Sequence, residues 1–186
     1  MTSPSQLPFA DDRILLNLAA YWSAKRGALP LPQRRDIDPL DMPRSLLPHL
    51  ALVEPVEGGP AVRFRLIGTE LVQRYGRDAT GKTSADIWQP PYRDHMERLY
   101  AMVFADRRPL YAESTQTWPE EGMSRVRRLL LPIAADGSGH AAFVLGAVTW
   151  TVSGQPPSQP EPKRIAVEAL EKAVLQATFR GLLDPG

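Results

Sequence analysis

The sequence predicts an α+β fold, in which an antiparallel sheet of five strands carries helices on one side. Two stretches support the antiparallel sheet most directly. Residues 61–67 alternate apolar side chains with arginines, which is the period-two pattern of a half-buried strand. Residues 135–140, ADGSGH, contain the Asp-Gly pair that tight hairpin turns favour, and they separate two apolar stretches. The elements follow in the order helix, two strands, short helices, three strands and a last helix.

The first predicted element is a flanking helix within residues 1–28. Asp11 or Asp12 can cap its start, and Gly27 follows a basic last turn, as expected at a helix end. Its apolar residues recur at helical spacing and form one stripe: Ile14, Leu15, Leu18, Ala19 and Trp22. A stripe of this kind either covers a sheet or joins a second subunit.

The domain itself is predicted over residues 29–152. Its strands are expected at five places along the chain: 49–56, 61–67, 109–118, 123–133 and 140–152. Between the second and third strands we expect a helix at 68–75, a short helix near Trp88, and a longer helix that ends at about Ala105.

Two further segments follow the predicted domain. Residues 153–161, SGQPPSQPE, have the composition of a proline-rich linker. Residues 162–180 have the pattern of an amphipathic helix, with one apolar stripe: Ile165, Ala166, Ala169, Leu170, Ala173, Val174 and Ala177.

The composition excludes several classes of protein. The 22 basic and 21 acidic residues leave a net charge of +1, so the basic footprint of a nucleic-acid-binding protein is missing. Cysteine is absent, which excludes disulfides, thiolate metal sites and a cysteine nucleophile. Neither a signal peptide nor a membrane span is indicated. We therefore expect a cytoplasmic protein with no nucleic-acid or membrane partner.

Residues 76–83, GRDATGKT, match the phosphate-binding pattern G-x-x-x-x-G-K-[ST] of P-loop enzymes. Such a loop needs a buried strand before it and a long helix after it, whose N-terminus faces the phosphate. Here the preceding residues 70–75 have a helical pattern, and Pro90-Pro91 stops any long helix that starts at Thr83. We therefore interpret the octet as a turn in which glycines supply the required backbone freedom.

Three stretches of the chain resemble a PAS domain. Residues 64–88 contain the recurrent Asp-x-Thr-Gly-Lys turn, residues 105–111 end a helix, and residues 129–150 form a closing hairpin with the spacing P-x-x-x-x-G. The residues upstream resemble the leader of short, stand-alone bacterial PAS proteins found mainly in alphaproteobacteria. The similarity spans about residues 14–152.

This resemblance implies a sensory or interaction module built on a five-stranded antiparallel sheet with helices over one face. PAS domains often dimerise through a helix that precedes the domain, which implies a homodimer whose interface includes Ile14, Leu15, Leu18 and Trp22. They also often enclose a ligand cavity, and seven side chains are candidates for its lining: Phe64, Tyr75, Trp88, Tyr92, Met96, Tyr100 and Phe143. The same residues could instead simply form the core.

His95 lies on the helix where oxygen-sensing PAS domains carry a haem ligand, and a neutral imidazole can ligate haem iron. A structural histidine at the margin of the apolar stripe is the alternative. His49 and His140 have no neighbouring carboxylates in the sequence that would complete a metal site. The arginine-rich strand SRVRRLL is more typical of a solvated face than of an anion site.

No catalytic motif is recognised, so no catalytic residue is assigned and no cofactor is expected. The leading hypothesis is a non-catalytic signalling module that acts by protein–protein interaction with a separate partner, gated by a small ligand. The alternative is a sensor of haem or another cofactor, with His95 as the ligand.

Overall fold

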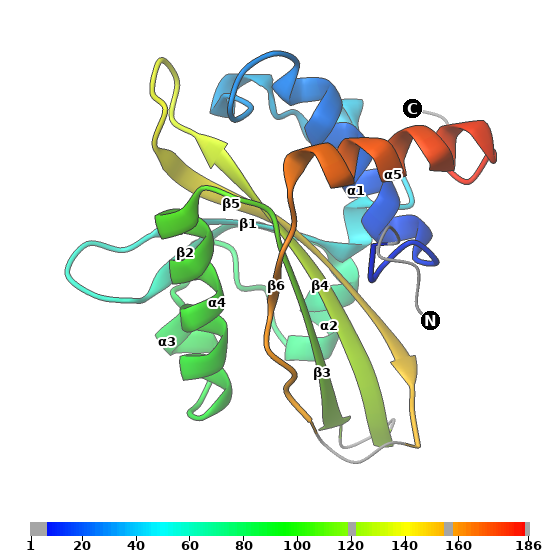
Figure 1. Ribbon diagram of the computed structural model, residues 1–186. Helices are drawn as coiled ribbons and strands as arrows, with labels where there is room; N and C mark the ends of the chain where they lie inside the picture. The colour runs from blue at the N-terminus through cyan, green and yellow to red at the C-terminus, as the bar shows by residue number, and fades with distance from the viewer. Residues whose placement is uncertain (1–6, 119–121, 155–157, 185–186) are drawn as a thin grey trace.

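The computed structural model describes residues 7–118, 122–154 and 158–184, and it has the predicted α+β class. A six-stranded antiparallel sheet runs through the molecule in the order β2-β1-β5-β4-β3-β6 (Figure 1). Its strands have these bounds: β1 Leu50–Pro55, β2 Val62–Ile67, β3 Leu110–Trp118, β4 Gly122–Ala134, β5 Ala141–Val152 and β6 Lys163–Arg164. The predicted hairpin of β4 and β5 is confirmed, and β1 and β2 also pair as antiparallel neighbours.

The prediction of five strands is wrong by one short strand. β6 lies within the segment that was expected to be helical, and it pairs with β3 through Leu110 and Tyr111. The predicted linker also contacts the sheet, because the Thr115 amide donates to the Ser158 carbonyl oxygen at 2.8 Å. The last helix, α5, therefore begins only at Val167 and covers Val167–Phe179.

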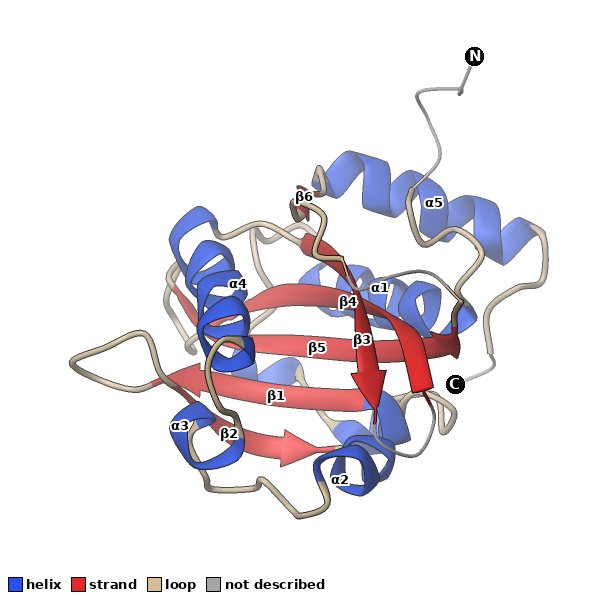
Figure 2. Cartoon of the chain, turned by 90° about the horizontal axis from the view of Figure 1, so that it is seen from below, coloured by secondary structure: helices blue, strands red, loops and turns tan. Residues whose placement is uncertain are grey.

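Helices cover both faces of the sheet, where the sequence predicted one (Figure 2). One side, here the α4 face, carries the three helices of the middle of the chain: α2 Thr69–Tyr75, α3 Ser84–Ile87 and α4 Tyr92–Asp106. The other side, the α1 face, carries α5 and the first helix, α1 Arg13–Arg26. Both faces need a cover because the central strands are apolar on both sides. In β1, Leu50 and Leu52 are buried on the α1 face, and Ala51 and Val53 are buried on the α4 face.

The start and end of α1 follow the predicted signals. The Asp12 carboxylate accepts from the Leu15 amide at 3.1 Å as an N-cap, and Gly27 ends the helix with a positive φ of 54°. The proline-rich segment after α1 forms only single 3₁₀ turns, as its composition requires: Arg34–Asp36, Pro39–Asp41 and Leu47–His49.

The apolar stripe of α1 packs against the sheet of its own subunit. Leu15, Leu18 and Trp22 are fully buried there, and only Ile14 is partly exposed. The Trp22 indole N–H donates to the Pro132 carbonyl oxygen at 2.8 Å, so the ring is both packed and hydrogen-bonded. The sheet of the same subunit covers these side chains and leaves only Ile14 partly exposed, and the dimer interface stays a prediction.

The C-terminal helix docks on α1. Its buried residues Leu170 and Ala177 belong to the core of the α1 face, and Glu171 forms an ion pair with Arg26. Beyond the helix, Asn17 and Asp184 exchange two hydrogen bonds, at 2.9 and 3.0 Å. Segments from the two ends of the described chain thus form one layer (Figure 1).

The octet GRDATGKT covers the outer edge of β2. The Phe64 amide donates to the Lys82 carbonyl oxygen at 2.9 Å, and the Gly81 amide donates to the Phe64 carbonyl oxygen at 2.8 Å. Helix α2 precedes the octet, and a single-turn helix, α3, follows it. The octet therefore has neither the strand nor the long helix of a P-loop, and it protects an edge strand instead.

Candidate ligand-binding site

A groove opens on the α4 face, between the helices and the outer part of β3, with a volume of about 580 Å³. Its lining, which defines the aromatic groove, comes from α2, the α3–α4 connection, β3 and the segment before β6: Arg74, Tyr75, Ile87, Trp88, Gln89, Pro91, Tyr92, Gln116, Thr117 and Gln159. Three of the seven predicted pocket residues, Tyr75, Trp88 and Tyr92, are among them. A groove of this volume is large enough for a drug-sized molecule.

Trp88 is the centre of the aromatic groove. Local structure fixes its position, because the Thr83–Asp86 capping box starts α3 and Trp88 ends it. Four aromatic rings surround the indole with centroid distances of 5.3 to 6.5 Å: Phe64, Tyr75, Tyr92 and Tyr100. Tyr75 and Tyr92 meet it edge to face, the arrangement that aromatic quadrupoles favour.

The other predicted pocket residues do not line the groove. Phe64, Met96 and Tyr100 are buried in the core of the α4 face, so the alternative interpretation, a packing role, holds for them. Phe143 lies on the α1 face, with the Arg34 guanidinium 5.6 Å from its ring, and its assignment to the pocket is corrected. Along β5, Phe143 is in phase with Leu145 and Ala147, which face α1.

Arg128, in the middle of β4, is the main residue of this region that the sequence analysis missed. It is 1% exposed, and it donates to the Ser114 hydroxyl at 2.9 Å and to the Tyr92 hydroxyl at 3.3 Å. The expectation of a solvated face for this strand is wrong, since Arg127 is also largely buried. Alternation with Leu130, which faces α4, is the sequence signal that could have placed Arg128 inside.

Two phenols and an imidazole in the surroundings of the Arg128 side chain are uncharged. Burial raises the pKa of both Tyr75 and Tyr100, and the neighbouring Tyr92 raises both further, so the two phenols keep their protons. Burial lowers the pKa of His95, and the positive charge of Arg128 lowers it further, so this imidazole is neutral at pH 7.

His95 lies on α4 next to Arg128 but outside the lining of the aromatic groove. Its Nε2 atom is buried without a hydrogen-bond partner. The enclosed space beside Arg128 and Tyr92 has a volume of only about 10 Å³, which is no more than the space for one water molecule. His95 lines neither this space nor the aromatic groove, and its role as a haem ligand stays a prediction.

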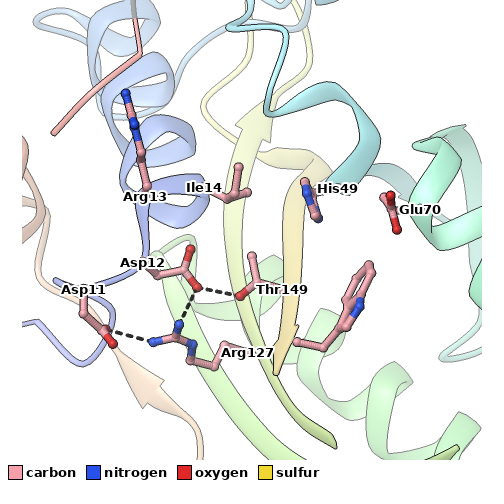
Figure 3. A pocket seen from close by; sticks show the side chains of 9 residues that line it. Asp11, Asp12, Arg13, Ile14, His49, Glu70, Arg127 and Thr149 are labelled. Carbon is pink, nitrogen blue, oxygen red and sulfur yellow. Dashed lines mark hydrogen bonds and ion pairs between the residues drawn. The ribbon is translucent and has the colours of Figure 1, made fainter. Parts of the chain in front are cut away.

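A second hollow, of about 380 Å³, lies where the start of α1 meets β4 and β5 (Figure 3). Arg127 forms ion pairs there with Asp11 at 2.8 Å and Asp12 at 3.0 Å, and Asp12 also accepts from the Thr149 hydroxyl at 2.5 Å. These charges satisfy one another and tie the start of α1 to the sheet. The hollow is therefore a structural junction rather than a ligand site.

Among residues 7–118, 122–154 and 158–184, no group of three or more His, Asp or Glu residues lies close enough to hold a metal ion. In the same part of the chain, no helix has the length and apolarity to cross a bilayer.

Comparison with known proteins gives one match. The family model of the PAS domain matches residues 11–149 of the 186-residue chain, and the matched part includes α1 and all strands except β6 in whole or in large part. No curated protein matches the chain.

Proposed function

The chain belongs to the PAS domain family, and we propose that it is a non-catalytic sensory module whose aromatic groove binds a small molecule and gates contact with another protein. PAS domains are generally sensory and non-catalytic, and they commonly mediate protein interactions and dimerisation. The family therefore supports the signalling role at the coarse level. The ligand, the gating and the partner are our proposal.

The observation that carries the proposal is the aromatic groove. Ligand sites are concave and largely apolar, with a few polar groups that orient the ligand. The groove combines the partly exposed Tyr75 and Tyr92 and the largely buried Trp88 with the side chains of Gln116 and Gln159. Trp88 also contributes an indole N–H that is buried without a hydrogen-bond partner, which a bound acceptor would satisfy.

The groove also offers a route from ligand to output. Its walls come from α2, the start of α4, β3 and the segment before β6 that contains Gln159. That segment leads directly into β6 and α5. A ligand that contacts Gln159 and Trp88 together would change how the segment lies on the sheet, and a partner protein or a second copy would recognise the change.

Native mass spectrometry of the purified full chain tests the proposal. We expect a small molecule to be retained by the natural protein and lost from Thr117→Trp, whose indole would fill the groove. Thr151→Trp is the matched control, because Thr151 is exposed on β5 outside the groove lining, and it should retain the molecule. Equal retention by all three proteins, or no retained molecule in any of them, would contradict a ligand in this groove.

A further inference from the structure

Two adjacent arginines on β4 have opposite electrostatic surroundings. Arg127 points to the α1 face and forms ion pairs with Asp11 and Asp12. Arg128 points to the α4 face, and among the described residues no carboxylate lies within ion-pair distance of it. Glu97, a buried carboxylate on the same face, is instead bonded to the Ser84 hydroxyl at 2.5 Å.

A buried guanidinium without a counter-charge is unfavourable, because its hydration is lost and no opposite charge replaces it. The hydroxyls of Ser114 and Tyr92 accept two of its five N–H bonds but carry no charge. Tyr75, Tyr100 and His95 are neutral as well, as described above. In the described structure the positive charge of Arg128 is therefore uncompensated.

The other unsatisfied groups nearby are potential donors. The Trp88 indole N–H has no acceptor, and His95 Nε2 is also buried without a partner. Tyr92 is close to both Trp88 and Arg128, since its ring centroid is 5.5 Å from that of Trp88 and 5.9 Å from Arg128 Cζ. Trp88 and Arg128 thus bring donors to the neighbourhood of Tyr92, and the described residues supply them with no acceptor of opposite charge, which is the complement of a bound anion.

The aromatic groove and the small space beside Arg128 are neighbours. The small space beside Arg128 and the groove share Arg74, Tyr75 and Tyr92 in their linings, so these side chains form the wall between them. The contact from Arg128 to the Tyr92 hydroxyl, at 3.3 Å, is long for a hydrogen bond. A carboxylate can displace this hydroxyl, because a charge-assisted bidentate bond to arginine is about twice as strong as a neutral one.

We propose that the ligand of the aromatic groove is a small organic acid, whose carboxylate binds Arg128 beneath Tyr92 and whose apolar body lies against Trp88 and Ile87. This inference rests on the proposed function and adds the chemical class of the ligand. The described residues leave Arg128 without a counter-charge, and in the complex the carboxylate of the ligand supplies this charge.

Matched acids and amides test the charge requirement. The probes are phenylacetate, indole-3-acetate and octanoate, each compared with its uncharged amide, with the full chain at millimolar probe concentration. We expect at least one acid to raise the thermal unfolding midpoint and to bind about tenfold or more tightly than its amide in calorimetry. Equal binding of acid and amide would overturn the inference but leave the groove as a ligand site. The inference is also overturned if no acid binds.

Substitution of Arg128 tests the position of the anion. Arg128→Met removes the buried charge at similar volume, so the protein should fold and be as stable as the natural chain or more stable. Its response to the acids should be lost. Arg108→Met, which changes the net charge equally at an exposed position, should respond as the natural chain does. An unchanged response in Arg128→Met would overturn the inference.

Tyr92→Phe provides a second variant that keeps the charge. It removes the hydroxyl that the carboxylate must displace, so the acids should bind severalfold more tightly, while the amides should be little affected. If the affinity for the acids falls in Tyr92→Phe, the carboxylate does not replace this hydroxyl and the proposed geometry is wrong.

Discussion

The two faces of the sheet differ in how fully their polar groups are satisfied. On the α1 face, Trp22 is hydrogen-bonded to Pro132, Arg127 is paired with two aspartates, and the remaining core is mostly aliphatic. On the α4 face, the described part of the chain gives the Trp88 indole N–H no partner and Arg128 no counter-charge. Ser23 Oγ and Arg26 Nε on α1 also lack a partner among the described residues, so the two faces differ in degree: on the α4 face the unsatisfied groups include the central tryptophan and arginine.

This difference indicates which face of the sheet binds a ligand. Buried polar groups without partners reduce stability, so they persist where another requirement outweighs that cost. The α1 face has the features of a stabilising layer. The α4 face combines a groove, an aromatic cluster and unsatisfied donors, which are features of a binding layer. Substitutions at matched positions on the two faces test this distinction.

The largest effect is expected on the α1 face, from Trp22→Ala. This change removes a side chain with 0% exposure and leaves a large cavity between α1 and β4, so we expect a loss of about 3–5 kcal/mol in the free energy of unfolding. Urea denaturation measures it. The control Leu40→Ala, at a residue that is 91% exposed, should stay within about 0.5 kcal/mol. A loss below about 1 kcal/mol for Trp22→Ala would mean that α1 is not part of the core.

Ser84→Ala is expected to have the next largest effect, on the α4 face. The Ser84 hydroxyl accepts from the Val62 amide at 3.2 Å and donates to Glu97, so both buried groups lose a partner. We expect a loss of about 2–3 kcal/mol. A double-mutant cycle with Glu97→Gln should show coupling between the two residues. Additive losses in that cycle would show that the Ser84–Glu97 contact contributes nothing to stability.

A smaller difference is expected between the two buried tryptophans. Trp22→Phe leaves the Pro132 carbonyl without its donor, whereas Trp88→Phe removes a donor that has no partner. Trp22→Phe should therefore cost about 1–2 kcal/mol more in unfolding free energy than Trp88→Phe. Chemical denaturation of both variants side by side measures the difference. The reverse order would remove the main distinction between the two faces.

The smallest effect is expected at Lys82, the lysine of the P-loop-like octet. Its side chain is exposed, and only its backbone carbonyl bonds to the edge of β2. Lys82→Ala should change the unfolding free energy by less than about 0.5 kcal/mol. Calorimetry should detect no Mg-ATP binding before or after the substitution. Micromolar ATP binding by the natural chain would show that the octet is a nucleotide site.

Local signals predicted the framework of the fold well. The caps at Asp12 and Gly27 marked α1, alternation marked β2, and the Asp-Gly turn marked the β4–β5 hairpin, because these features depend on residues close in sequence. The family resemblance to a PAS domain is confirmed by the match to residues 11–149. β6 was missed because two residues carry no periodic pattern, and its pairing with β3 is a long-range contact.

The site was harder to predict than the fold. Tyr75, Trp88 and Tyr92 were assigned to the pocket from residue type and the family resemblance, and they line the groove. Phe143 was misassigned because alternation shows which residues share a face but not which helices cover that face. Arg128 was missed because arginine side chains are usually exposed in proteins. Only the tertiary packing shows that this one is buried.

The layer formed by α1 and α5 also determines when the protein can finish folding during synthesis. The hydrogen bonds between Asn17 and Asp184 cannot form until Asp184, which is 167 residues later in the chain, has been synthesised. At a synthesis rate of about 5–20 residues per second, this delay is on the order of ten to thirty seconds. During that interval the part of α1 that α5 will cover is exposed on the nascent chain. We expect stalled chains that end before residue 165 to bind chaperones that recognise apolar helices, and released full-length chains to escape them; crosslinking to the nascent chain would detect the difference.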